Sequence, residues 1–269
     1  MDNLSLWFAA LILVVSICSG AHAGNSLAGQ QLVVMTFNIR HGCGRASFGD
    51  TSSRFFRSCR KHLVEIVDAI RSAAPDVVGL QEVDEGIIDD IARGAGLHAV
   101  FQAHNGSGYG SWWGNALLSR YPIAGISAFP IGGIPGKNRS ALVAKVLVGG
   151  DMITVANVHT QNRQKDDVAV QAVRDGMGSE PGLRIVLGDF NMEPADHRLE
   201  VIRSMGMTDT ARAAPSGSFL GTYDSGLGRR IDYVFVDTKN FEPIASRLIA
   251  EEHREASDHI GYVAVVKRR

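Results

Sequence analysis

The stretch LVVMTFNI, residues 32–39, begins the pattern that decides the fold. Its mostly apolar composition and its length have the pattern of one buried strand. After a polar loop that contains glycine, residues 63–70 place four apolar side chains at the i, i+3, i+4, i+7 spacing of a helix. Pro75 ends that helix, and VVGL at residues 77–80 begins a second strand. The stretch therefore predicts a unit of strand, helix and strand.

The rest of the chain adds hairpins to this unit. Residues 141–148 and 152–158 read as apolar strands, and the turn signal Gly149-Gly150-Asp151 joins them. A helix is expected over about residues 166–176. Further strands are expected at residues 183–187, 230–236, 241–249 and 260–266. Hairpins and crossover helices in one domain predict an α/β architecture in which helices cover the strands.

The composition is that of an ordinary globular protein. The 269 residues are 45% hydrophobic and 20% charged, and the formal net charge is -1. These values exclude a coiled coil, a collagen, a disordered chain and a polytopic membrane protein. The balanced charge gives no electrostatic reason for tight, sequence-independent binding to nucleic acid.

The N-terminus has the pattern of an export signal. The apolar run at residues 4–18 is shorter than the roughly 20 residues of a spanning helix, and Ala21-His22-Ala23 follows it as a cleavage site. We expect residues 1–23 to be a signal peptide and residues 24–269 to be one mature domain, secreted or periplasmic. An uncleaved anchor and a lipoprotein signal at Cys18 are the alternatives.

Six short segments place a carboxylate, an amide or an imidazole at or just beyond the end of an apolar strand. They are TFNIRHG (36–42), GLQEV (79–83), NVHT (157–160), GDFN (188–191), RIDY (230–233) and SDH (257–259). Ligands of α/β sheets gather where strands end, so residues far apart in the sequence can meet there. A single strand-end Asp is more often a cap or a turn residue. Together the six segments predict one site.

In these segments the chain resembles the endonuclease/exonuclease/phosphatase superfamily of metal-dependent phosphoesterases, which is DNase I-like. TFNIRHG, GLQEV, WGNALLSRYPI, NVHT, GDFN, RIDYVFV and SDH occur in the family's order from about residue 32 to residue 266. The resemblance implies a four-layer α/β sandwich, in which two packed mixed β-sheets are flanked by helices. It also implies that the site lies at one edge of the sandwich.

The metal site that the resemblance implies consists of oxygen ligands. The family pattern puts Glu82 directly on the metal, with Asn38 assisting and Asp258 completing the metal side. Carboxylate and amide oxygens are hard ligands, which suit Mg²⁺ or Mn²⁺. The expected cofactor is therefore Mg²⁺ or Mn²⁺.

The implied catalytic groups act on the water and on the phosphate. Asp189 is similar to the family residue that orients or deprotonates the attacking water, and Asn191 is similar to an amide that binds the phosphate. His259 resembles the phosphate-contacting imidazole, and Asp232 resembles the carboxylate that fixes its tautomer and charge. His159 matches the second histidine. Hydrolysis of a phosphate ester needs an activated water and neutralised phosphoryl charge, which these residue types supply.

Four side chains are candidates for substrate binding. Asn162 matches an amide that contacts the phosphate in part of the family. Arg139 and Arg230 are candidates for phosphate contact, with a solvated position as the alternative. Arg40 stands where nuclease relatives often carry a metal-binding carboxylate, and a guanidinium cannot ligate a cation. Because it follows Asn38 by two residues on an extended segment, we expect it to share that face and to bind a phosphate oxygen.

The remaining polar candidates match the motifs less well. His41, His98, His104 and His253 are interpreted as surface or loop residues. The amide of Asn115 caps a strand or supports the site, and the sequence leaves both open.

The chemistry is better defined than the substrate, which is a phosphodiester or phosphomonoester in a small molecule, a lipid head group or a nucleic acid. A nuclease acting on extracytoplasmic DNA would need basic loops, yet removal of Asp2 with the signal leaves equal numbers of acidic and basic residues. A sphingomyelinase-type enzyme would need an exposed apolar hairpin, and residues 111–113 are a candidate, although partial burial is expected at a strand start. A non-catalytic binding module is the weakest alternative. We expect a monomer with no obligate protein partner.

Cys43 and Cys59 are predicted to form a disulfide. They are the only cysteines that remain after cleavage, and an oxidising compartment favours a disulfide over a metal site. Closing the loop contributes about 3 kcal/mol in the chain-entropy model. Intact mass after alkylation without reductant should show no modified thiol. Two alkylated thiols in freshly exported protein would contradict the pairing.

Overall fold

The computed structural model describes residues 27–45, 60–104, 112–134, 137–162, 167–178, 182–213, 221–223 and 228–269. The expected signal peptide and its cleavage site lie outside these residues. Cys59 also lies outside them, so the predicted disulfide stays a prediction. Over the described ranges, no helix has both the length and the apolar character that crossing a membrane requires.

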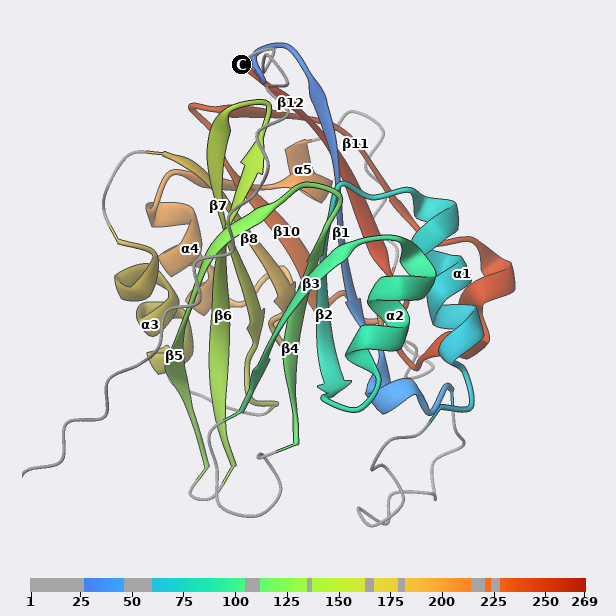
Figure 1. Cartoon of the computed structure of the whole chain (residues 1–269). Coiled ribbons are helices and arrows are strands. Elements are labelled where there is room, and N and C mark those ends of the chain that lie inside the picture. The colour runs from blue at the N-terminus through green and yellow to red at the C-terminus, as the bar shows by residue number, and fades with distance from the viewer. Residues whose placement is uncertain are drawn as a thin grey trace, which may run out of the picture.

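Two six-stranded mixed sheets form the centre of the molecule (Figure 1). The first sheet has the order β11-β12-β1-β2-β4-β3 and contains β1 Gln31–Asn38, β2 Val77–Asp84, β3 His98–Ala103, β4 Trp113–Ser119, β11 Phe241–Leu248 and β12 Tyr262–Arg268. The second has the order β5-β6-β7-β8-β10-β9 and contains β5 Ile123–Ile134, β6 Lys137–Val148, β7 Asp151–His159, β8 Leu183–Asp189, β9 Met207–Asp209 and β10 Asp232–Asp237. The pairs β1 with β2 and β7 with β8 are parallel.

Helices cover the outer face of each sheet (Figure 1). Helices α1 Leu63–Ala73 and α2 Ile88–Ala95 lie on the first sheet, and α3 Val168–Met177 and α4 Glu200–Ser204 lie on the second. The short helix α5 is Thr210–Ala213, and the 3₁₀ turns are η1 Arg40–Gly42, η2 His197–Leu199 and η3 Glu251–Ala256. The four-layer α/β sandwich implied by the family resemblance is confirmed.

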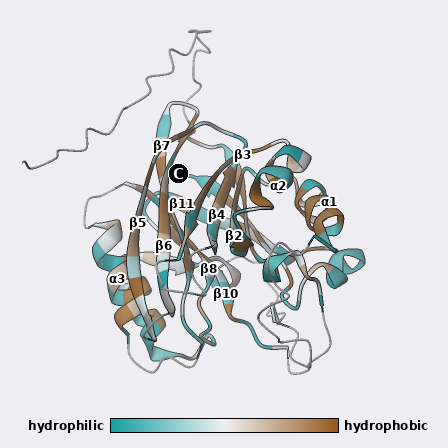
Figure 2. Cartoon of the chain, turned by 60° about the horizontal axis from the view of Figure 1, so that its bottom comes forward, coloured by the Kyte–Doolittle hydropathy of each residue, from teal (hydrophilic) through white to brown (hydrophobic). Residues whose placement is uncertain are grey.

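Three apolar cores lie between these four layers, and each central strand contributes to two of them. Val34 faces the core between the sheets, whereas Met35 faces the core under α1 and α2. Val155 and Ala156 of β7 alternate in the same way between the inner core and the core under α3. Brown strands accordingly lie between helices that carry both brown and teal bands (Figure 2). Because neighbouring residues face opposite cores, a slip of one residue would place every side chain in the wrong core.

The strand directions bring the polar motifs to one edge of the sandwich. The parallel strands β1, β2, β7 and β8 end there with Asn38, the Glu82 segment, His159 and Asp189. Strand β10 is antiparallel to β8, and its first residue, Asp232, pairs with Asp189. The C-terminal ends of the parallel strands and the N-terminal end of β10 therefore lie at the same edge, and residues that are distant in sequence meet there.

A buried amide on β7 connects the two sheets directly behind this edge. The Asn157 Nδ2 donates to the carbonyl oxygens of Leu80 on β2 and Ala116 on β4, at 2.8 and 2.7 Å. Its Oδ1 accepts a 2.7 Å hydrogen bond from the Gln81 Nε2. Asn115 is also buried and donates to the carbonyl oxygen of Ser140, at 2.8 Å. Of the two readings of Asn115, the structure supports the one in which its amide braces the site.

Replacement of Asn157 tests this connection. Asn157→Ala should lower the free energy of unfolding by about 2–4 kcal/mol, because buried carbonyl and amide groups lose their partners. Urea denaturation followed by circular dichroism measures the change. Asn162→Ala is the matched control at an exposed asparagine, and a loss within about 0.5 kcal/mol is expected there. Equal losses of unfolding free energy in the two variants would show that the Asn157 amide does not contribute specifically to stability.

Candidate active site

Glu82 occupies a strained position in β2. Its φ is +52°, in the left-handed region, and the pairing of β2 with β4 shifts register between Leu80 and Val83. Such a backbone conformation costs about 1–3 kcal/mol for a residue other than glycine and persists only where the surrounding structure holds it. The bulge leaves the Glu82 side chain 24% exposed, in contrast to its buried neighbours Gln81 and Val83.

The surroundings of Glu82 suit a divalent cation. Burial acts to raise its pKa, but electrostatic interactions with His41, Arg139 and His259 outweigh burial and hold the pKa below its usual value. Burial also raises the pKa of Asp258, where the lowering effect of His259 is opposed by the negative charge of Glu82. Two carboxylates that repel each other in this way are stabilised by a cation between them, so these oxygen donors fit Mg²⁺ or Mn²⁺.

Asp189 lies at the centre of the site. Its Oδ2 accepts a 3.1 Å hydrogen bond from the Asn38 Nδ2 and lies 3.4 Å from the His159 Nε2 and 3.7 Å from the His259 Nε2. Its Oδ1 accepts a 2.9 Å hydrogen bond from the Asn191 backbone N–H. Four of the predicted site residues therefore meet on one carboxylate.

The pKa of Asp189 is raised to about 7. Burial is the largest cause, the positive charge of His259 opposes it, and the negative charge of Asp232 adds to it. A carboxyl with a pKa near neutrality can accept a proton and release it again at the working pH. Asp189 thus has the property required of the residue that activates the water.

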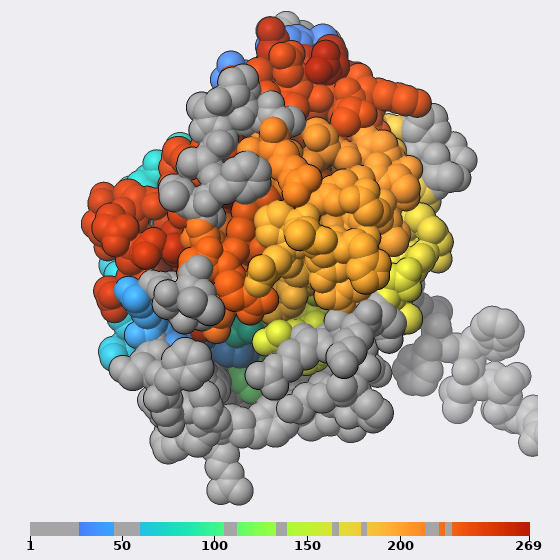
Figure 3. Space-filling model, turned by 180° about the vertical axis from the view of Figure 1, so that it is seen from behind, coloured from blue at the N-terminus to red at the C-terminus, as the bar shows by residue number. Residues whose placement is uncertain are grey.

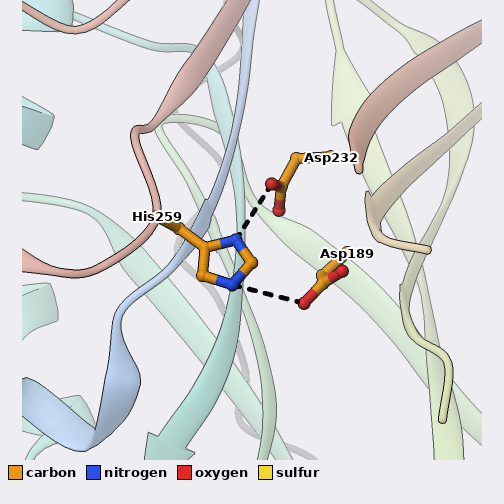
Figure 4. Close-up of side chains that lie close together, drawn as sticks. All are labelled: Asp189, Asp232 and His259. Atoms are coloured by element: carbon orange, nitrogen blue, oxygen red, sulfur yellow. Dashed lines mark hydrogen bonds and ion pairs between the residues drawn. The ribbon is translucent and has the colours of Figure 1, made fainter. Parts of the chain in front are cut away.

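Asp232 and His259 form a buried pair beside Asp189 (Figure 4). The His259 Nδ1 lies 2.9 Å from the Asp232 Oδ2, and the Nε2 points toward Asp189. Burial lowers the pKa of His259, but the carboxylates of Asp232 and Asp189 outweigh it and raise the pKa to about 10. Although ligand atoms of the three residues lie within 4.8 Å of one another, a protonated imidazole cannot bind a metal. His259 is therefore a cation that faces the Asp189 carboxylate.

The loop that carries His259 is attached to the end of β1. The Ser257 Oγ donates a 2.7 Å hydrogen bond to the Asn38 carbonyl oxygen and accepts a 3.2 Å hydrogen bond from the His259 backbone N–H. The Tyr223 ring packs on the His259 ring with centroids 4.8 Å apart. These contacts fix the imidazole relative to the metal side of the site.

Arg139 and His159 form the opposite wall. The Arg139 guanidinium lies over the Trp113 ring, 4.8 Å from its centroid, and its Nη1 lies 2.8 Å from the His159 Nε2. Burial and the charge of Arg139 hold the pKa of His159 well below its usual value. His159 is therefore neutral and can accept the hydrogen bond. Arg139 lies close to Asp189 and Glu82, whose charges act on its pKa, so the structure brings it to the site.

Arg40 also reaches the site, but by a different geometry from the one expected. β1 ends at Asn38, and Arg40 has a φ of +46° in the turn η1. The prediction that it continues an extended segment is wrong. Its Nε lies 3.6 Å from the Asp258 Oδ2, and its Nη1 donates a 3.1 Å hydrogen bond to the Gly44 carbonyl oxygen. The turn, not the strand alternation, places the guanidinium beside the metal-side carboxylate.

The structure contradicts the substrate contact predicted for Arg230. Its guanidinium is 5% exposed and donates two hydrogen bonds to the carboxylate of Asp209, with the Tyr233 ring 4.3 Å away. A carboxylate at the end of β9 thus holds this cation inside the fold. Asn162 is exposed after β7, and its phosphate contact stays a prediction.

Two histidines interpreted as surface or loop residues do lie in a turn and a loop, but neither side chain is exposed, so the surface interpretation is wrong for them. His104 is buried, and its Nδ1 lies 3.1 Å from the Ser140 Oγ. The His41 Nδ1 lies 2.6 Å from the Asp84 Oδ1, and its Nε2 lies 3.6 Å from the Glu82 Oε2. The available signal was that His41 belongs to the strand-end motif TFNIRHG. His98 is exposed, as expected.

Seen from behind, the molecule is hollowed at this edge (Figure 3). Blue, blue-green and green atoms of the first half of the chain meet there below the orange C-terminal part. Trp112 and Trp113 are half-buried, as expected for the start of β4.

The match to a family model agrees with this geometry. The model of the Endonuclease/Exonuclease/phosphatase family matches residues 35–259. The chain belongs to this family, as its motifs predicted. No curated protein sequence matches the chain at a significant level.

Solved structures of the same architecture agree with the fold. A family protein from Beutenbergia cavernae has a TM-score of 0.70 and 23% identity, over 88% of this chain and 72% of that one. The Bacteroides thetaiotaomicron mannosyl-6-phosphatase has a TM-score of 0.68 and 17% identity, over 87% and 99%. The human Nocturnin catalytic domain with bound sulfate has a TM-score of 0.68 and 17% identity, over 89% and 94%.

Membership of the family defines the class of enzyme. Its members are phosphoesterase hydrolases and generally depend on a divalent metal. This chain is therefore a phosphoric ester hydrolase, and its buried group of carboxylates and imidazoles is where that chemistry is expected.

The charge of His259 can be measured directly. In the metal-free protein, its imidazole should stay protonated up to about pH 10, because two carboxylates stabilise the cation. Asp232→Asn should lower this pKa, while Asp175→Asn, at an exposed aspartate of α3, should leave it unchanged. Side-chain ¹H–¹⁵N NMR against pH gives the titration. A wild-type His259 that titrates near 6.5 would contradict the assignment.

Proposed function

We propose that this chain is an exported, Mg²⁺- or Mn²⁺-dependent phosphoesterase that hydrolyses a phosphodiester or phosphomonoester by attack of water. One observation carries the proposal. The Asp189 carboxylate is shared by the Asn38 amide and two imidazoles of opposite character, His159 neutral and His259 cationic. Such an arrangement provides a base for water next to a cation for the phosphoryl group.

The residues divide the work in the following way. Asp189 takes the proton from the attacking water, since its pKa of about 7 lets it exist as a carboxylate near neutrality. His259 stabilises negative charge on the phosphoryl oxygens, and Asp232 keeps it protonated and oriented through the 2.9 Å contact. Asn191 donates one amide hydrogen to the Thr160 carbonyl oxygen at 3.0 Å, which leaves the other for the phosphate.

Glu82, Asn38 and Asp258 would hold the metal ion. When bound, such an ion supplies Lewis-acid neutralisation of phosphoryl charge. Arg139 and Arg40 add fixed positive charge on the two sides of the site, through their positions near Glu82 and Asp258.

A compact substrate is favoured over long DNA. Binding to duplex DNA depends on many cations spread over a surface, whereas Arg40 and Arg139 are both engaged inside the cleft with Asp258 and His159. The mannosyl-6-phosphatase among the similar structures acts on a small phosphomonoester by its name. Export rests on the pattern of residues 1–23. A nuclease and a head-group phospholipase of the sphingomyelinase type are the alternatives.

A substrate panel with and without metal tests the function. Sugar phosphates, sphingomyelin, phosphoinositides, bis-p-nitrophenyl phosphate and plasmid DNA should separate the three substrate classes. Chelation should abolish hydrolysis of the active substrate, and Mg²⁺ or Mn²⁺ should restore it. Full activity after exhaustive chelation would rule out this mechanism.

Replacement of Asp189 tests the mechanism on whichever substrate is active. Asp189→Asn should lower kcat by at least about 100-fold with folding intact, because the amide cannot accept the proton of the water. Asp175→Asn, the same change at an exposed position, should leave kcat unchanged. A turnover near that of the wild type in the first variant would remove Asp189 from this role.

A further inference from the structure

His41 is held in an unusual backbone turn at the edge of the site. Arg40 and His41 have consecutive left-handed φ values of +46° and +57°, directly after β1 ends. Neither is glycine, so the turn carries strain of about 1–3 kcal/mol at each residue. The turn directs the His41 side chain back against β2, where it is only 12% exposed. Strain of this kind gathers at functional sites, since the surrounding structure must maintain it.

The His41 ring has a carboxylate behind it. The Asp84 Oδ1 lies 2.6 Å from the Nδ1, and the Asp84 side chain is buried at the end of β2. A carboxylate on Nδ1 accepts the proton of that nitrogen and fixes the orientation of the ring. Metal-binding histidines commonly have this arrangement, in which the second nitrogen faces the ion.

The other ring nitrogen faces the expected metal ligand. The His41 Nε2 lies 3.6 Å from the Glu82 Oε2, which is longer than an N–H···O hydrogen bond of 2.7–3.2 Å. Two ligands that bind one ion at about 2.1 Å lie about 3.0 Å apart at a right angle and about 3.4 Å apart at the tetrahedral angle. The observed separation is therefore close to that of two atoms that share an ion.

Aromatic rings hold His41 in this orientation. The ring centroids of Trp112 and Trp113 lie 5.4 and 5.2 Å from that of His41. The tilted and edge contacts leave the ring little freedom to turn away from Glu82.

The other two histidines of the site have different partners. His159 lies 2.8 Å from the Arg139 Nη1 through its Nε2, and a guanidinium competes with a metal for that nitrogen. His259 lies between the carboxylates of Asp232 and Asp189. Among the described residues, His41 is thus the imidazole with a carboxylate behind one nitrogen and Glu82 in front of the other.

We propose that the His41 Nε2 is a nitrogen ligand of the same divalent ion that Glu82 binds, with Asp84 as its orienting carboxylate. The inference rests on the proposed metal-dependent function. A mixed set of imidazole and carboxylate favours a first-row transition ion such as Mn²⁺ over Mg²⁺, which prefers oxygen ligands alone. His41 accordingly sets the metal preference of the enzyme.

Pulsed electron paramagnetic resonance of the Mn²⁺-loaded full-length mature protein tests the ligand directly. Nitrogen bound to Mn²⁺ gives a ¹⁴N modulation of the electron spin echo, and selective ¹⁵N-histidine labelling assigns it to an imidazole. We expect the modulation in the wild type and its loss in His41→Gln. His98→Gln, at an exposed histidine of β3, is the matched control and should keep it.

Metal affinity gives a second readout that needs no substrate. By calorimetry, His41→Gln should weaken Mn²⁺ binding about tenfold or more, with a smaller effect on Mg²⁺. Asp84→Asn should weaken Mn²⁺ binding to a lesser extent, and it tests the same arrangement if His41→Gln does not fold.

The outcomes separate the two proposals. A wild type without histidine modulation, or a modulation that persists in His41→Gln, would overturn the role of His41. Metal-dependent hydrolysis in that case would leave the proposed function standing. A histidine modulation that disappears with His41, in a protein that hydrolyses no phosphate ester, would support the ligand and contradict the function.

Discussion

The hydrogen bonds of Asn157 fix the distance between the two halves of the site. Asn157 lies on β7, and its amide donates to the carbonyl oxygens of Leu80 and Ala116 on the opposite sheet. Glu82 follows Leu80 by two residues, and His159 follows Asn157 by two residues. Apolar packing between sheets tolerates small sliding, whereas an amide with all its partners inside the core does not. The position of the metal side relative to the catalytic side therefore depends on this one buried side chain.

With the distances fixed, the charges in the site determine its acid and base roles. Asp189 and Glu82 are both carboxylates at strand ends, yet their pKa values move in opposite directions. Burial dominates at Asp189 and raises its pKa to about 7, whereas the cations around Glu82 lower its pKa. Two carboxyl groups whose pKa values are shifted in opposite directions take different roles. Asp189 becomes a proton acceptor, and Glu82 stays charged as a metal ligand. The same carboxylates raise the pKa of His259 to about 10 and keep it cationic.

The sequence predicted the parts of the fold that local pattern controls. The strand at residues 32–39 and the helix at 63–70 appear as β1 and α1, and the hairpin around Gly149-Gly150-Asp151 joins β6 and β7. The motif residues at strand ends meet on Asp189, because parallel strands end at a common edge. By contrast, α2 and β3 were not recognised, since they are short and only partly apolar. The four layers came from the family resemblance and not from periodicity, which cannot show how sheets pack.

The errors in the site have a common physical origin. Arg230 and His41 each flank a motif residue. From the sequence, Arg230 is a candidate for phosphate contact, and His41 is interpreted as a surface or loop residue. The direction of each side chain is decided by a carboxylate that lies far from it in sequence, Asp209 for Arg230 and Asp84 for His41. Both carboxylates terminate strands, but Asp209 ends β9 at the outside of its sheet, whereas Asp84 ends β2 next to Glu82. A motif therefore identifies which residues are near the site, while the strand order determines which of them can act in it.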